Sequence, residues 1–177
     1  MIMFEIRIHS RGGQGGVTGA RLLALAAIHD GSYATACVFY GPQRRGAPVI
    51  TFVRTDDSPI KIYSHIKEPD MVVVLDASVM DIVNVFQGLK KGGRIFINSA
   101  EEIDFPGFST THADLTKIAL EENLIIAGHT ILNTPMLGSL AKMGIISLSS
   151  AKKSILEIFP DERNIKAAEK GYREMKI

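Results

Sequence analysis

Short apolar runs alternate with longer, helix-like segments along this chain. The run from Met71 to Leu75 is continuously apolar, which is typical of a central strand covered on both faces. Three further segments are β-permissive and bounded by turn residues, namely 3–8, 34–39 and 94–98. Two other segments have helical character: 17–30, which is nearly all apolar, and 79–90, which is amphipathic. These patterns predict strands separated by helices.

Helical periodicity dominates the second half of the chain. Four helices are predicted there, over 115–122, 134–143, 150–159 and 161–175. The last two form a helical tail over about residues 149–177, with Ser149 or Ser150 as a natural N-cap. Between the predicted helices, 101–108 is expected to be a loop, and 124–127 either a strand or the end of a helix.

We therefore predict a single α/β domain over residues 1–177. Strands separated by helices favour a Rossmann-like, doubly wound and mainly parallel sheet with helices on both faces. Residues 49–54 and 60–63 flank the turn-rich segment from Thr55 to Pro59, which predicts a hairpin. This hairpin would make the sheet mixed.

Composition narrows the function classes. The chain has 177 residues, 20 basic and 19 acidic, and its net charge of +1 provides no global field for holding nucleic acid or an anionic membrane. No apolar run approaches the ~20 residues of a bilayer span, and the first five residues do not resemble a secretory leader. The single cysteine, Cys37, excludes an internal disulfide and a cysteine-held iron–sulfur cluster. We expect a soluble, cytoplasmic protein with Cys37 as a buried, inert thiol.

Charge is distributed unevenly. Up to Arg54 the chain carries six arginines, no lysine and only two carboxylates, so this part has a net charge of +4. Arginine favours planar, bidentate contact with carboxylate or phosphate. Three of these arginines, Arg11, Arg44 and Arg45, lie in the glycine-rich turn and in the loop that follows the second predicted strand.

A glycine-rich turn follows the first predicted strand and precedes the first predicted helix. Its residues are Arg11, Gly12, Gly13, Gln14, Gly15 and Gly16. Backbone N–H groups and the helix dipole at such a junction stabilise an anion. The dinucleotide pattern GxGxxG is nearly met, but its sixth position is Thr18, and no carboxylate for a ribose follows the second strand. These two differences from the pattern argue against NAD binding at this turn.

Two interpretations of these loops stay open. Arg44 and Arg45 have the chemistry to meet a ribose phosphate, as in NADP or coenzyme A. Alternatively, the glycines only permit a tight turn, with Arg11 and Gln14 facing a partner subunit, and the arginine pair lies in solvent or forms salt bridges between subunits.

Other chemistry-bearing patterns are missing from the sequence. It contains no GxxxxGK[ST], GxSxG or HExxH motif, and its five histidines lack metal-ligand spacing. We predict no catalytic residue and no metal ligand in this chain. Asp76 follows a buried strand, where α/β sheets place working residues, but we favour a role as cap of the following helix.

Several segments resemble the gamma subunit of 2-oxoacid:ferredoxin oxidoreductases, with the pyruvate and 2-ketoisovalerate enzymes as the nearest members. The resemblance is carried by the stretches 11–18, 39–49, 68–70 and 133–138, in the expected order, and by the helical tail. It covers nearly the whole chain and is far more specific than the glycine-rich turn alone.

The resemblance implies a role within a larger enzyme. Such complexes oxidatively decarboxylate a 2-oxoacid to an acyl-CoA with thiamine diphosphate, Mg and [4Fe-4S] clusters, and pass electrons to ferredoxin. It implies that alpha, beta and in some enzymes delta subunits hold those groups, while this chain packs against them near coenzyme A and is not active alone. The matching loop residues are Arg11, Gly12, Gly13, Gln14, Gly15, Gly16, Tyr40, Gly41, Arg44, Arg45, Gly46 and Ala47. The alternative is a stand-alone NADP- or flavin-binding Rossmann-like reductase domain.

Overall fold

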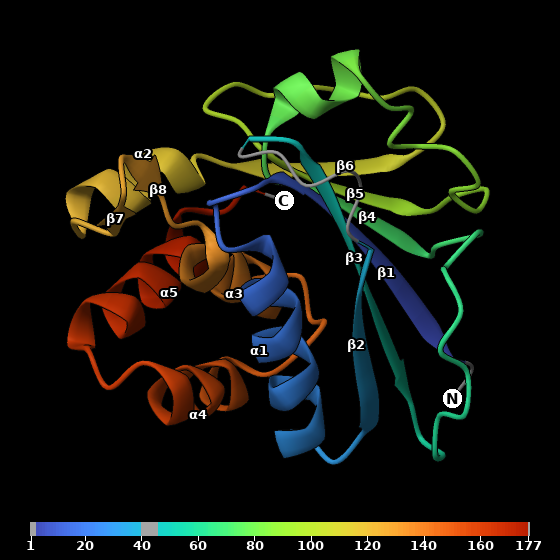
Figure 1. Cartoon of the computed structure of the whole chain (residues 1–177), viewed down its shortest axis with the longest axis horizontal. Helices are drawn as coiled ribbons and strands as arrows, with labels where there is room; N and C mark the ends of the chain where they lie inside the picture. The colour runs from blue at the N-terminus through green and yellow to red at the C-terminus, as the bar shows by residue number, and fades with distance from the viewer. Residues whose placement is uncertain (1–2, 40–45, 177) are drawn as a thin grey trace.

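A six-stranded sheet organises the molecule (Figure 1). The computed structural model describes residues 3–39 and 46–176. The strands are β1 (Phe4–Arg11), β2 (Tyr33–Phe39), β3 (Pro48–Asp56), β4 (Met71–Val74), β5 (Arg94–Asn98) and β6 (Ser109–Ala113), in the spatial order β2-β3-β1-β4-β5-β6. β1, β4, β5 and β6 pair in parallel, whereas β3 pairs antiparallel with both β1 and β2. The predicted α/β fold with a mainly parallel, mixed sheet is confirmed.

The antiparallel part of the sheet differs from the predicted hairpin. Residues 60–63 form no strand, so the prediction of a hairpin across 55–59 is wrong. Residues 60–63 cannot pair with β3, because β3 is already hydrogen-bonded along both edges, to β1 and to β2. In the segment after β3, Ile60 and Ile66 are buried although they belong to no strand.

The α-helices of the described residues lie on one side of the sheet (Figure 1). They are α1 (Gly16–His29), α2 (Leu115–Glu121), α3 (Asn133–Lys142), α4 (Leu148–Ile158) and α5 (Glu162–Glu174). Side chains from all five pack with Ile6, Ile8 and Val73 of the sheet in one buried cluster. The predicted helical tail is confirmed, but α4 begins after Ser147, whose hydroxyl accepts a hydrogen bond from the Ser150 N–H, and not at Ser149 or Ser150.

The opposite face carries a 3-10 helix and turns. The amphipathic helix predicted over 79–90 is wrong, because only η1 (Ala77–Asp81) forms there and a series of turns follows. Arg7 explains part of this outcome: its Nη2 donates to the carbonyl oxygens of Val85 (2.8 Å) and Gln87 (2.6 Å), which fixes them toward the sheet. Helices therefore do not cover both faces, contrary to the prediction.

Two short elements complete the fold. β7 (Ile125–Ile126) and β8 (His129–Thr130) form a small hairpin, which resolves the ambiguity over 124–127 in favour of a strand. β6 was missed because its sequence, Ser-Thr-Thr-His-Ala, is mostly polar. None of the helices in the described part of the chain is long and apolar enough to cross a membrane.

Candidate functional site

The glycine-rich turn has the backbone geometry that only glycine adopts readily. Gly13 and Gly15 have φ angles of 101° and 84°, in the left-handed region. Gly15 is the N-cap of α1, and no side chain of the described residues caps this helix end. The first amides of a helix have no acceptor within the helix, so the N–H groups of the first α1 turn are available to an external acceptor. An anion is favoured there by the helix dipole.

Gly16 and Gly19 serve packing. A Cβ on Gly16 would collide with the side chain of Ser10, and a Cβ on Gly19 would lie 2.8 Å from Met136 Cε. Gly16 thus brings α1 close to β1, and Gly19 brings it close to α3. These two glycines supply the close approach that the sixth position of the motif, occupied here by Thr18, would otherwise provide.

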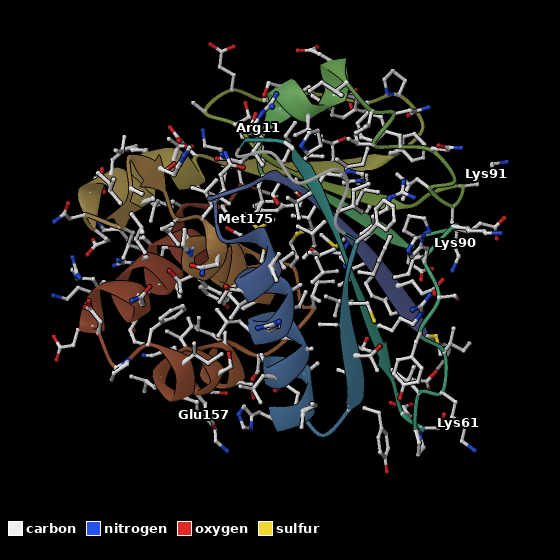
Figure 2. All side chains as sticks on the ribbon, viewed as in Figure 1. Arg11, Lys61, Lys90, Lys91, Glu157 and Met175 are labelled. Atoms are coloured by element: carbon white, nitrogen blue, oxygen red, sulfur yellow. The ribbon has the colours of Figure 1, made fainter. Side chains whose placement is uncertain are left out.

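Two loops far apart in the sequence meet at this end of the sheet. Arg11 Nη1 donates to the carbonyl oxygen of Gly46 at 2.9 Å, and Gly12 N–H donates to the carbonyl oxygen of Ala47 at 3.1 Å. Figure 2 shows Arg11 at the end of the sheet opposite Lys61. The structure therefore brings together the described parts of both predicted loops. Tyr40, Gly41, Arg44 and Arg45 lie outside the described residues.

Asp76 links β4 to the glycine-rich turn. Its Oδ1 accepts hydrogen bonds from the Ser78 N–H and hydroxyl, which confirms the predicted capping role. Its Oδ2 accepts a hydrogen bond from Gln14 Nε2 at 2.8 Å. Partial burial alone would raise the pKa of Asp76, but the hydrogen bonds from Ser78 and Gln14 and the charge of Arg11 lower it overall.

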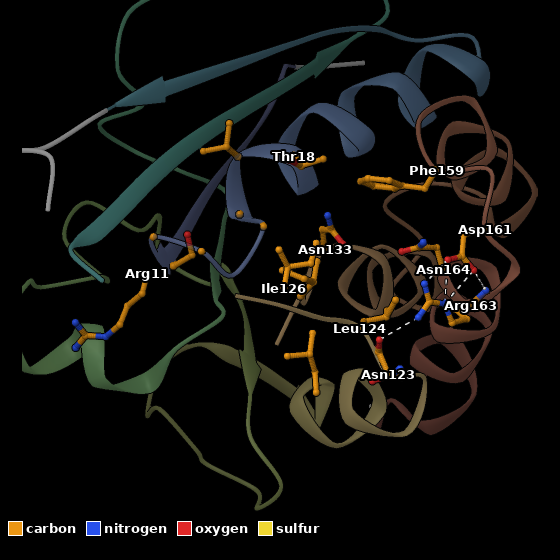
Figure 3. A pocket seen from close by; sticks show the side chains of 18 of the residues that line it. Arg11, Thr18, Asn123, Leu124, Ile126, Asn133, Phe159, Asp161, Arg163 and Asn164 are labelled. Atoms are coloured by element: carbon orange, nitrogen blue, oxygen red, sulfur yellow. Dashed lines mark hydrogen bonds and ion pairs between the residues drawn. The ribbon is translucent and has the colours of Figure 1, made fainter. Parts of the chain in front are cut away.

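A cleft of about 600 Å³ opens beside the turn (Figure 3). It lies between the N-terminus of α1, the β7–β8 hairpin and the connection from α4 to α5. Its apolar wall includes Leu124, Ile126 and Phe159. In Figure 3 the Arg11 side chain points away from the cleft, so the turn presents mainly backbone groups to it.

The far rim of the cleft is polar and closed by an ion pair. Arg163 Nη2 lies 2.6 Å from Asp161 Oδ2, and Arg163 Nη1 donates to the carbonyl oxygen of Asn123 at 3.3 Å. The hydrogen bonds from Arg163 lower the pKa of Asp161. Sequence reasoning missed this rim and the apolar wall, because residues 123–133 and 159–164 reach the turn only through long-range helix packing.

The described residues hold no metal cluster. Among residues 3–39 and 46–176, no group of three or more His, Cys, Asp or Glu side chains is arranged to bind a metal ion.

Cys37 is partly exposed on β2, so the prediction of a buried thiol is wrong. β2 is an edge strand of the sheet, and this position leaves its side chains less covered than those of a central strand.

The fold and the turn define an α/β domain whose strand–turn–helix junction opens into a mostly apolar cleft. The family model described as pyruvate ferredoxin/flavodoxin oxidoreductase matches residues 5–174. The chain is 47% identical to the pyruvate synthase subunit PorC of Methanocaldococcus jannaschii, with 98% of this chain and 97% of that protein covered. It is also 47% identical to the pyruvate/ketoisovalerate oxidoreductases common subunit gamma of Thermococcus kodakarensis, with 96% of each covered.

A solved structure supports the same assignment. The crystal structure of the pyruvate oxidoreductase subunit PORC from Thermotoga maritima matches with a TM-score of 0.83 and 34% identity, and covers 98% of this chain and 97% of that one. This chain belongs to the pyruvate ferredoxin/flavodoxin oxidoreductase family. The resemblance inferred from the loop motifs is thereby confirmed.

Proposed function

We propose that this chain is the gamma subunit of a multi-subunit 2-oxoacid:ferredoxin oxidoreductase of the pyruvate type. The observation that carries the proposal is the end-to-end match to gamma-type and PorC subunits at 47% identity. The reaction would be the oxidative decarboxylation of pyruvate or a related 2-oxoacid to an acyl-CoA, with electrons passed to ferredoxin in the cytoplasm. The chain contributes to this reaction only as part of the complex.

Division of labour follows from the donor set of the chain. A [4Fe-4S] cluster requires four ligands, usually thiolates, and this sequence has one cysteine. The residues therefore do not fit a cluster. We assign the clusters, thiamine diphosphate and Mg to alpha, beta and delta partners.

Coenzyme A is the ligand that best fits the glycine-rich turn in this setting. The uncapped amides of the first α1 turn suit a phosphate, and the neighbouring cleft suits an extended, partly apolar group. We place the turn from Arg11 to Gly16 at the phosphate and the loop that ends at Gly46 and Ala47 beside it. Arg11 links these two loops, since its guanidinium donates to the Gly46 carbonyl oxygen, and it is held in place by a further hydrogen bond to Ser78 Oγ of η1.

Reconstitution tests the proposal. The subunit is removed from the native enzyme under anaerobic conditions, and the wild-type chain is added back. We expect recovery of coenzyme A-dependent 2-oxoacid oxidation with ferredoxin as acceptor. A chain that neither joins the complex nor restores turnover contradicts the proposal. Micromolar binding of NADP or a flavin by the isolated chain would support the reductase alternative instead.

Replacing Arg44 and Arg45 together with alanine tests the second loop. We expect turnover of the reconstituted enzyme to fall by roughly tenfold or more, because each lost charge-assisted contact is worth ~1.5–3 kcal/mol. The stability of the subunit should fall less than the turnover of the complex does. Equal melting together with unchanged kinetics would contradict a functional role for this pair.

A further inference from the structure

The carboxylate of Asp76 serves two elements at once. Oδ1 accepts from the N–H of Ser78 at 3.0 Å and from its hydroxyl, and so caps η1 within its own loop. Oδ2 faces the other way and accepts from Gln14 Nε2 at 2.8 Å, across 62 positions of the sequence. Capping alone explains the first pair of contacts but not the second.

Gln14 connects Asp76 to the backbone of the glycine-rich turn. Its Oε1 accepts a hydrogen bond from the Arg11 N–H at 2.8 Å. A backbone N–H only donates and an ionised carboxylate only accepts, so the two partners fix which way the Gln14 amide points. The turn is thus held through the side chain of one of its own residues.

The side chain of Arg11 joins the same hydrogen-bond network through Ser78 and Asp76. Its Nε donates to Ser78 Oγ at 2.8 Å and lies 3.7 Å from Asp76 Oδ2, while Nη1 donates to the Gly46 carbonyl oxygen. These contacts connect the end of β1, the start of η1 and the loop that leads into β3. They lie at the carboxyl ends of the adjacent parallel strands β1 and β4, where the open α/β sheets bind ligands.

We propose that Asp76 is a positioning residue, which acts through Gln14 and Arg11 to hold the glycine-rich turn and the Gly46 end of the second loop in the arrangement that binds the phosphate of coenzyme A. This inference rests on the proposed function. In this proposal Asp76 does not contact the ligand. It positions the glycine-rich turn and the Gly46 end of the second loop, which do.

The geometry specifies a substitution and its rescue. In Asp76→Asn the new amide keeps an oxygen for the Ser78 N–H but turns an NH2 group toward the NH2 group of Gln14, so two donors face each other. Adding Gln14→Glu restores an acceptor opposite the amide introduced at position 76 and keeps an oxygen for the Arg11 N–H. The double variant D76N/Q14E reverses the direction of the hydrogen bond and preserves the net charge.

Asp30 offers a matched control at the other end of α1. Its carboxylate also joins two elements, since Oδ2 and Oδ1 accept from the Ser147 N–H (2.7 Å) and hydroxyl (2.6 Å) at the start of α4. Asp30→Asn therefore perturbs a similar carboxylate link far from the glycine-rich turn.

The experiment measures steady-state kinetics of the enzyme reconstituted with each variant subunit. For Asp76→Asn we expect the KM for coenzyme A to rise roughly tenfold, the effect of one charge-assisted hydrogen bond, with kcat and the KM for the 2-oxoacid nearly unchanged. D76N/Q14E should return the KM for coenzyme A to within about threefold of wild type. Asp30→Asn should lower the melting temperature without moving that KM.

An unchanged KM for coenzyme A in Asp76→Asn overturns the inference, as does a double variant that shows no recovery. If the single variant fails to assemble, the double variant decides in the same way: restored assembly and a restored KM support the inference, and failure of both overturns it. A wild-type subunit that does not restore turnover would instead mark failure of the proposed function.

Discussion

Arg7 and His9 form a buried pair of basic side chains on β1. They are 7% and 2% exposed, and Arg7 Nε donates to His9 Nε2 at 3.1 Å. His9 must be neutral to accept this hydrogen bond, so its proton lies on Nδ1, which has no partner among the described residues. Burial, and then the charge of Arg7, lower the pKa of His9 to about 4.

His9 makes stability depend on pH. The unfolded chain binds a proton near pH 6.5, whereas the folded chain does so only near pH 4. Between these values the unfolded state carries more protons, so stability should fall as the pH decreases from 6.5 towards 4, by up to ~3 kcal/mol from this group. Urea unfolding at pH 7, 6 and 5 measures the effect.

His9→Gln is the matched variant for this measurement, since it keeps an acceptor for Arg7 but does not titrate. Its unfolding free energy should decline less steeply with acid than that of the wild type. Parallel pH profiles for the two proteins would mean that other groups cause the decline.

Helix packing depends on two glycines where α3 crosses α5. A Cβ on Gly138 would collide with the Ala168 carbonyl oxygen, and one on Gly171 with the Pro135 carbonyl oxygen. Ser139 Oγ also donates to the Gly171 carbonyl oxygen at 3.1 Å. The two backbones are therefore in direct contact, with no space for a side chain between them.

Gly171→Ala should separate these helices. Although alanine favours an isolated helix by ~1 kcal/mol, we expect a net loss of about 1–3 kcal/mol because the clash is with backbone that cannot move aside. Chemical denaturation of the subunit measures this loss. Lys166→Ala, at an exposed position of the same helix, should stay within ~0.5 kcal/mol of wild type. Equal stability of the two variants would show that the contact relaxes without cost.

Elements were predictable from sequence where local pattern decides them. β4 follows from its continuous apolar run, and the glycine-rich turn follows from residues that no regular element tolerates. The helix predicted over 79–90 does not form, in part because Arg7, distant in sequence, donates hydrogen bonds to the carbonyl oxygens of Val85 and Gln87. The Gln14–Asp76 contact was likewise hidden, although two polar residues at the ends of predicted parallel strands were a usable signal. The cleft wall depends on packing of α4 and α5 and had no local signature.

The two faces of the sheet differ in how they are covered. In the described part of the chain, helices α1 to α5 and one face of the sheet share a large, continuous buried cluster. The other face has a much smaller cluster, whose buried members are Val72, Val74, Val79, Val85 and Ile97. Segments with few buried contacts open locally at lower free energy than the core. We therefore expect the layer of turns to open locally at lower free energy than the helical layer.

Arg7 is a polar link that ties Val85 and Gln87 of the turn layer to the sheet, so Arg7→Lys should loosen that part of the layer selectively. Lysine keeps the charge but lacks the planar fork that serves Val85, Gln87 and His9 together. We expect hydrogen exchange of residues 82–89 to accelerate by roughly tenfold or more, since one lost charge-assisted hydrogen bond is worth ~1.5–3 kcal/mol. Amides of α1 and α3 should exchange nearly as in the wild type, because their cluster lies on the other side of the sheet. Uniform acceleration across the chain would show instead that both layers open as one cooperative unit.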